Sequence, residues 1–309
     1  MLRPYRRRFP LPALSRRSTA ELLLFGTTFI WASTFIVLKW GLTEWSPLFL
    51  LAVRFTIAVA LYAVLFPSAV QGMTAAALRR GSLLALFFTL GCVLQTVGLQ
   101  YTTASKSAFI TGMMAVFTPL VQYVWERRPP TRANLISIAI VIVGLWLLTN
   151  PSAGGSAGGS AAGGLNRGDL LTLFCAISFA CYIVYLDLAS RHHEPLVLTF
   201  AQIGPTTLYC WLGVLLETPR AEPSWMSVSV IVYLAVAATI LTGFLMTRYQ
   251  KETTPTRIVV IYSVEPVWTA LAAAALLGER LTAVSISGGG LILVGVLLTQ
   301  LADAKPDRV

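Results

Sequence analysis

Ten apolar stretches, each close to the length needed to cross a lipid bilayer, fill the chain from Glu21 to Leu301. A helix needs about 20 mainly apolar residues to cross ~30 Å of hydrocarbon. Only 12% of the 309 residues are charged, too few for the surface of a soluble protein of this length. The sequence therefore predicts an all-α integral membrane protein with ten transmembrane helices. The expected spans are 21–39, 47–66, 81–100, 104–126, 131–149, 169–189, 196–216, 227–249, 256–277 and 282–301.

The net charge of +10 is distributed unequally between the two sides of these spans. With the N-terminus in the cytoplasm, 17 of the 23 Lys and Arg residues lie inside and five outside, and Arg54 falls within a span. Basic residues accumulate in cytoplasmic loops, so this bias predicts that both termini are cytoplasmic. The basic excess is then explained by topology and by anionic lipid headgroups rather than by nucleic-acid binding.

A segment rich in Gly and Ser divides the chain into two sets of five spans. The halves share short motifs, since Thr102–Lys106 resembles Thr253–Arg257 and Glu126-Arg127 resembles Glu279-Arg280. Because each half has an odd number of spans, the halves insert with opposite orientations, an arrangement typical of secondary transporters. The expected domains are a basic cytoplasmic segment (1–20), a five-helix repeat (21–149), a flexible extracytoplasmic linker (150–168), a second, inverted five-helix repeat (169–301) and a cytoplasmic tail (302–309).

Polar and aromatic residues recur at helical spacing along several spans. In hydrocarbon such side chains face the bundle interior or water, so these stripes predict one central cavity between the halves. For any single member of a stripe, packing between helices is the alternative role. The candidates for lining the cavity are Trp31, Thr34, Gln95, Thr111, Met114, Thr118, Tyr182, Tyr185, Thr242, Tyr262 and Glu265.

Two charged residues lie deep within spans. Glu265 is about ten residues into the ninth span, and Pro266 after it removes a backbone donor. A carboxylate at this depth is either a coupling or substrate-binding group or a hydrogen-bonded anchor at a kink. Arg54 in the second span either pairs internally or extends its charge to the outer interface. Glu126 and Glu279, at span ends, are expected in interfacial salt bridges.

The closing part of the chain resembles a known family. Glu265-Pro266, Gly278-Glu279 and the run from Gly288 to Gly295 are similar to the end of an EamA-type repeat, of the drug/metabolite transporter superfamily. The resemblance implies ten helices, two inverted repeats and a cavity lined by spans one, three, four, six, eight and nine. It also implies secondary transport, often export, commonly in bacterial inner membranes. The first half has Trp-Glu-Arg-Arg-Pro-Pro at 125–130 where the family pattern has Gly-Glu, and its Pro119 is out of register with Pro266. These departures leave the roles of Glu126 and Pro119 open.

The sequence thus predicts a secondary transporter that exports a small amino acid-like or drug-like metabolite by alternating access. One alternative is an importer or exchanger of a sugar or phosphorylated metabolite, with Lys106 and Arg257 as candidate cationic ligands. A remoter alternative is an intramembrane lipid-modifying enzyme, but His192 and His193 have no nucleophile or metal-ligand set beside them. We expect a monomer in the lipid bilayer of a bacterial inner membrane, with no catalytic residue, metal, cofactor or nucleic-acid partner. Coupling to protons stays open.

Overall fold

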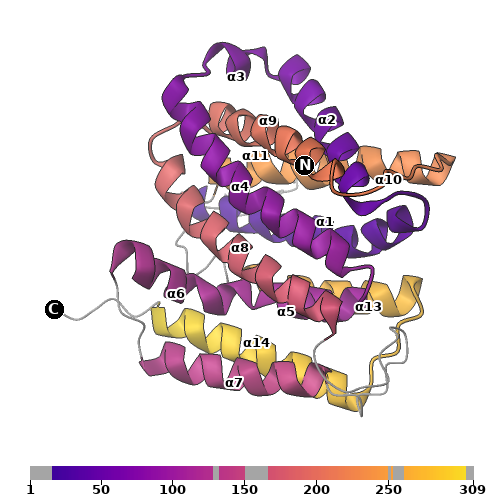
Figure 1. Ribbon diagram of the computed structural model, residues 1–309. Helices are drawn as coiled ribbons and strands as arrows, with labels where there is room; N and C mark the ends of the chain where they lie inside the picture. Colours follow the sequence, from indigo (N-terminus) through magenta and orange to yellow (C-terminus); the bar gives the residue numbers. More distant parts are fainter. Residues whose placement is uncertain (1–15, 128–131, 150–165, 250–251, 253–260, 304–309) are drawn as a thin grey trace, which may run out of the picture.

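The computed structural model describes residues 16–127, 132–149, 166–249, 252 and 261–303, and these form an assembly of helices (Figure 1). The linker, the chain termini and Thr253–Arg257 lie outside the described residues. The first half contains α1 (Arg16–Glu44), α2 (Pro47–Leu65), α3 (Pro67–Gln71), α4 (Ala75–Gly98), α5 (Ala104–Gly112), α6 (Met114–Glu126) and α7 (Arg132–Thr149). The second contains α8 (Arg167–Ser190), α9 (Pro195–Val214), α10 (Trp225–Ala235), the π-helix η2 (Val236–Leu241), α11 (Thr242–Tyr249), α13 (Glu265–Leu276) and α14 (Ala283–Asp303).

Length and apolarity make this a multi-pass membrane protein. Within the described residues, six helical segments of at least 18 residues are apolar enough to cross a membrane. Two shorter apolar helices, Leu135–Leu147 and Ala283–Leu298, accompany them. The all-α membrane fold predicted from the sequence is confirmed, whereas the count of ten spans stays a prediction. The six segments are Arg16–Glu44, Pro47–Leu65, Ala75–Gly98, Ala104–Trp125, Arg167–Ser190 and Trp225–Tyr249.

The two halves interlock instead of forming separate lobes. Helix α7 packs along α14 at one edge of the molecule, and α2 packs on α9 at the other (Figure 1). Between these pairs, α4 packs on α8 and α9, while α1 packs on α10, α11 and α13. Each contact of this kind joins a helix of one half to a helix of the other. This pattern of pairing is the one expected of two repeats related by a two-fold axis.

Three predicted spans differ from the continuous helices that the sequence suggested. The fourth span breaks at Met113, between α5 and α6, whereas Pro119 lies within α6. The eighth span contains η2 in place of regular α-helix. In the ninth, a turn at Ser263 and Val264 precedes α13. Pro266 explains the last break in part, because it provides no N–H for a bond to residue 262.

Glycines allow the closest approaches between the halves. A Cβ on Gly81 would overlap the backbone carbonyl of Ala201, so α4 and α9 meet almost backbone to backbone. On α14, a Cβ on Gly289 would lie 2.7 Å from the Phe109 ring, and one on Gly295 would lie 2.5 Å from Val141. Small residues at such crossings are the usual means of tight helix packing in membranes.

We predict that Gly81→Ala destabilises the protein although alanine is the better helix former. The added methyl group has no room against Ala201, and overpacking of this kind costs about 1–3 kcal/mol. The matched control is Gly204→Ala on α9, since a Cβ there meets nothing within 4 Å. Thermal unfolding in detergent should show a lower Tm for the first variant only; equal Tm values would contradict the packing.

The inverted topology predicts that two corresponding loops lie on opposite sides of the membrane. Ser68 lies between the second and third spans and Pro219 between the seventh and eighth, and both are exposed. In a background without native cysteines, Pro219→Cys should react with an impermeant maleimide on intact cells. Ser68→Cys should react only after permeabilisation. Labelling of both from one side would contradict inversion.

Candidate functional site

A cavity of about 110 Å³ lies among helices of both halves, and it is several times larger than a single water molecule requires. It is lined by residues of α1, α2, α4, α5, α6, α8, α9, η2 and α11, with Tyr262 and Glu265 from the ninth span. Ten residues that the sequence analysis named line it: Trp31, Thr34, Arg54, Gln95, Thr111, Met114, Tyr182, Thr242, Tyr262 and Glu265.

Two predicted residues lie elsewhere. The Thr118 hydroxyl donates 2.7 Å to the Met114 carbonyl of its own helix. The ring of Tyr185 packs against Trp125, with ring centroids 6.1 Å apart. Both residues share a helical face with cavity residues, but they lie beyond the cavity along that face. Helical spacing shows which side of a helix a residue occupies and leaves its distance from the cavity undetermined.

Helix α9 contributes residues that the sequence analysis missed. Gln202 and Ile203 line the cavity, and the Gln202 side-chain oxygen accepts a 3.1 Å hydrogen bond from the Tyr182 hydroxyl. The signal was present, because Thr199, Gln202 and Thr206 are spaced three and four residues apart and are all buried. The other lining residues outside the predicted set are Phe35, Phe88, Cys92, Phe179, Ile183, Ala238, Thr239, Gly243 and Met246.

The three interruptions in the helices all occur beside the cavity. Thr111 and Met114 flank the break at Met113, Ala238 and Thr239 belong to η2, and Tyr262 and Glu265 flank the turn at 263–264. Irregular backbone at membrane depth is tolerated where it is buried in protein or lines a water-filled cavity. At all three places the backbone therefore departs from a regular α-helix next to this cavity.

Glu265 is the first residue of α13 and is only 8% exposed. Its position favours a carboxylate, because the N-terminus of a helix carries a partial positive charge. Among the described residues, none forms an ion pair or a hydrogen bond with this carboxylate. The protein thus holds an acidic group in the wall of a buried cavity without a described counter-charge.

Arg54 of α2 is 5% exposed and does not extend to the membrane interface. Its Nε donates to the Thr239 hydroxyl at 3.0 Å, and one terminal nitrogen lies 3.4 Å from the Ala238 carbonyl. The guanidinium also lies 5.0 Å from the centroid of the Phe55 ring. No described carboxylate pairs with it. Internal hydrogen bonding, one of the two roles considered from the sequence, is the one observed.

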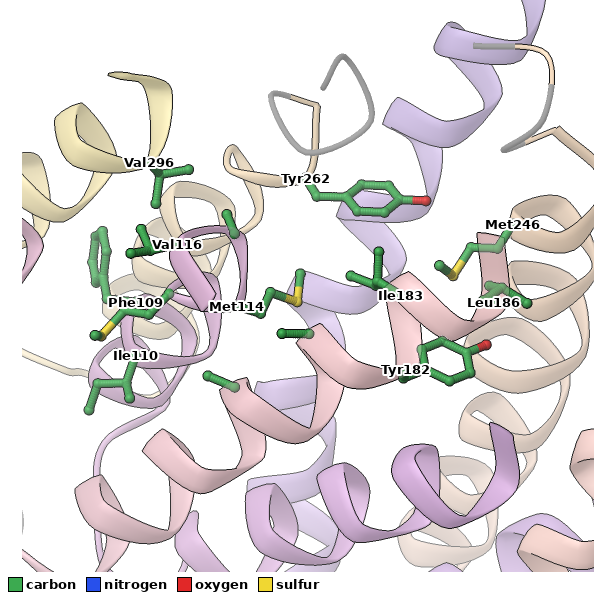
Figure 2. Packing of buried hydrophobic residues seen from close by; sticks show 14 of the residues in the cluster. Phe109, Ile110, Met114, Val116, Tyr182, Ile183, Leu186, Met246, Tyr262 and Val296 are labelled. Atoms are coloured by element: carbon green, nitrogen blue, oxygen red, sulfur yellow. The ribbon is translucent and has the colours of Figure 1, made fainter. Parts of the chain in front are cut away.

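Aromatic and apolar groups form much of the remaining wall. The rings of Trp31 and Tyr262 meet edge to face with centroids 4.9 Å apart. In Figure 2 the Tyr262 hydroxyl points towards Met246, with Ile183 beside the space between them. That hydroxyl is buried, with no full hydrogen bond among the described residues but with the Thr27 side chain within reach of it. The Gln95 amide, by contrast, donates 3.3 Å to Thr111.

A polar cluster joins the two halves at the end of the bundle that we predict to face outwards. Lys106 forms a 3.2 Å ion pair with Asp169, whose side chain is fully buried and also accepts 2.5 Å from Thr102. Glu279 accepts from the backbone nitrogens of Ala104 at 2.7 Å and Ser105 at 3.1 Å, and so caps α5. The expected salt bridge of Glu279 is thus replaced by a helix cap. The Glu126 side chain and Arg257 lie outside the described residues.

Comparison with known proteins identifies the family. A model described as the EamA-like transporter family matches residues 18–150 and again 166–301. The chain belongs to the EamA-like transporter family. This confirms the resemblance seen in the sequence. The protein is therefore a transporter and not an enzyme. His192 and His193, the residues considered for an enzyme, do not line the cavity. Partial burial and the nearby Arg80 lower the pKa of His193.

Individual relatives agree with the family. An "Uncharacterized transporter" of Archaeoglobus fulgidus is 30% identical over 286 residues, covering 93% of this chain and 87% of that protein. A "Probable amino-acid metabolite efflux pump" of Salmonella typhimurium is 27% identical over 87% of this chain and 90% of its own length. One crystal structure aligns with a TM-score of 0.66 at 17% identity, over 93% of this chain and 98% of its own, and so shares the fold.

We predict that Asp169→Asn destabilises the protein by about 2–3 kcal/mol, less than the loss of a fully buried pair, because Asp169 is fully buried but the Lys106 side chain that loses its counter-charge is 24% exposed. The matched control is Asp187→Asn on the same helix, whose ion pair with Arg191 is 25% exposed on the Asp side and 63% on the Arg side. An exposed pair contributes about 0–1 kcal/mol, so this change should be nearly silent. Chemical denaturation in detergent compares the two; equal losses would contradict the role of Asp169.

Proposed function

We propose that this EamA-like transporter is a secondary exporter of a small amino acid-like or drug-like metabolite, which it moves by alternating access. The observation that carries the proposal is one cavity between interlocked halves, lined by three helix interruptions. Inverted-repeat transporters bind their substrates at such places, near the midplane and at broken helices. Each half then rocks against the other and exposes the cavity to alternate sides.

Export is favoured by the relatives. The similar proteins of Salmonella typhimurium and Escherichia coli both carry the name "Probable amino-acid metabolite efflux pump", and each aligns over most of this chain. With cytoplasmic termini in a bacterial inner membrane, the solute would be taken from the cytoplasm. A monomer suffices for this mechanism, since both halves of the cavity come from one chain.

The import or exchange of a phosphorylated metabolite is less well supported. Lys106, one of the two cations considered for it, is already paired with Asp169. The cavity contains Arg54 but also Glu265, and a phosphate dianion beside a carboxylate would be repelled. The balance of one cation and one acid suits a solute that is not strongly anionic.

Glu265 is the residue that we assign to coupling or substrate binding. In inverted vesicles or proteoliposomes with a proton gradient, wild-type protein should move an amino acid or a drug-like cation, and Glu265→Gln should reduce that flux at least tenfold. The matched control is Glu194→Gln, an exposed residue before α9 whose side chain makes no cap hydrogen bond. Unchanged flux in Glu265→Gln would assign Glu265 a structural role, and absence of flux across a broad solute panel would contradict the proposed function.

A further inference from the structure

We propose that Glu279 is the latch of an outer gate: its carboxylate holds the start of α5 and keeps the cavity closed at the end that we predict to face outwards. Release of this contact is then a necessary step in opening the cavity to that side. The inference rests on the proposed alternating access and specifies which contact between the halves must break. It does not depend on the identity of the solute.

A layer of buried apolar side chains closes the cavity at that end. Four residues beyond Gln95 of the cavity wall, the chain reaches Leu99, and eight residues beyond Glu265 it reaches Ala273. Leu99 and Ala273 are fully buried and belong to one packed cluster. Because both halves contribute to it, this layer opens only if the halves separate there. The closing layer consists of Leu38, Leu99, Ala104, Ala108 and Ala273.

The Glu279 side chain crosses from the second half to the first beside the closing layer. Its carboxylate accepts hydrogen bonds from the backbone nitrogens of Ala104 at 2.7 Å and Ser105 at 3.1 Å, and from the Ser105 hydroxyl at 2.6 Å. The start of a helix has N–H groups without intrahelical partners and a partial positive charge, and both attract a carboxylate. Glu279 thus fixes α5, the helix that carries Ala104 and Ala108 of the closing layer.

The surroundings of Glu279 allow the contact to open. Glu279 is partly exposed, so water can bind the α5 donors once the carboxylate leaves. The preceding Gly278 has a φ of 66°, and a Cβ there would meet nothing within 4 Å. Asp169 holds the same segment through Thr102 and Lys106, but its side chain is fully buried. Of these two carboxylates, Glu279 is therefore the one that exchanges its partners for water more easily.

Helix α13 connects the latch to the cavity. Its first residue is Glu265 of the cavity wall, and near its other end the Ala273 carbonyl accepts 3.2 Å from the backbone N–H of Glu279. The 12 residues of this helix extend about 18 Å at 1.5 Å per residue. A solute that shifts Glu265 would move the latch as well, because a short helix moves as a unit. Occupancy of the cavity and opening of the outer gate are thus linked through one helix.

Lys39 of α1 adds to the contact. Its ammonium group donates 2.6 Å to the Thr102 carbonyl, just before α5, and attracts the Glu279 carboxylate. Glu279→Gln removes this attraction and the interaction of the charge with the helix start, while a side chain of the same size remains. The substitution therefore weakens the latch without leaving a void.

The test measures access to the protein from each side of the membrane with an impermeant methanethiosulfonate. Ala108→Cys, in a background whose four native cysteines are replaced by alanine, reports on the closing layer from outside. Cys92, kept as the sole cysteine in a second protein, reports on the cavity from the cytoplasmic side. With Glu279→Gln added, the outer reaction of Ala108→Cys should become at least fivefold faster. The inner reaction of Cys92 should become slower, because the outward-open state gains population.

Two further variants accompany this change. Glu222→Gln is the matched control, since Glu222 is an exposed carboxylate in the connection between α9 and α10 and should leave both rates unchanged. Ser105→Ala removes only the hydroxyl that donates to Glu279, so it should shift both rates in the same directions by a smaller factor. Because this variant acts on the same contact, the proposal remains testable if Glu279→Gln does not fold.

Two results would overturn the proposal. Unchanged rates in Glu279→Gln would mean that the contact does not hold the gate. Faster reaction from both sides would mean that the substitution merely loosens the fold. Failure of the proposed function is a separate result, because the labelling needs no solute. It would appear as absence of flux across the solute panel, whereas failure of the latch leaves wild-type flux intact.

Discussion

The need to hydrogen-bond every backbone polar group in hydrocarbon governs the architecture. Water is absent from the bilayer core, so a spanning segment must be helical along its lipid-facing length. The described chain obeys this rule with long helices and departs from it at Met113, at η2 and at 263–264. Each departure lies beside the central cavity, where protein groups or solvent can satisfy the backbone. The same constraint that determines the fold thus also locates the site.

Charged side chains follow a related principle, because a buried charge also needs a partner within the protein. Asp169 and Lys106 are buried as a pair, supported by Thr102 and by the capping box at the start of α8. Glu279 satisfies the backbone donors at the start of α5, which belongs to the other half. These groups are satisfied within the protein and connect the repeats at one end. Arg54 and Glu265 differ, because the described residues offer neither of them an opposite charge, and both face the cavity.

The sequence was sufficient for the class of fold, since repeated apolar stretches of membrane length are rare in soluble proteins. It also identified about half of the residues that line the cavity, nearly all of them by helical phase, as Trp31 and Tyr262 illustrate. It did not place Gln202, although Thr199, Gln202 and Thr206 recur at helical spacing on one face of α9. It could not show the break at Met113, which has no proline at that point, or the capping of α5 by Glu279. The cap is a contact between the two halves, and such contacts are set by packing in three dimensions rather than by local pattern.

The central claim is that one cavity is exposed alternately to the two sides of the membrane. Cys92 lines this cavity and can serve as the sole cysteine once Cys175, Cys181 and Cys210 are replaced by alanine. The Ser107 and Thr172 hydroxyls, 3.3 Å apart, provide a pair for a cross-link between α5 and α8. In this single-cysteine protein, an impermeant mercurial should reach Cys92 from either side of the membrane. When Ser107→Cys and Thr172→Cys are added and joined by a disulfide, the mercurial should reach Cys92 from the cytoplasmic side alone. Access from both sides in the linked protein, or from one fixed side in the free protein, would contradict alternating access.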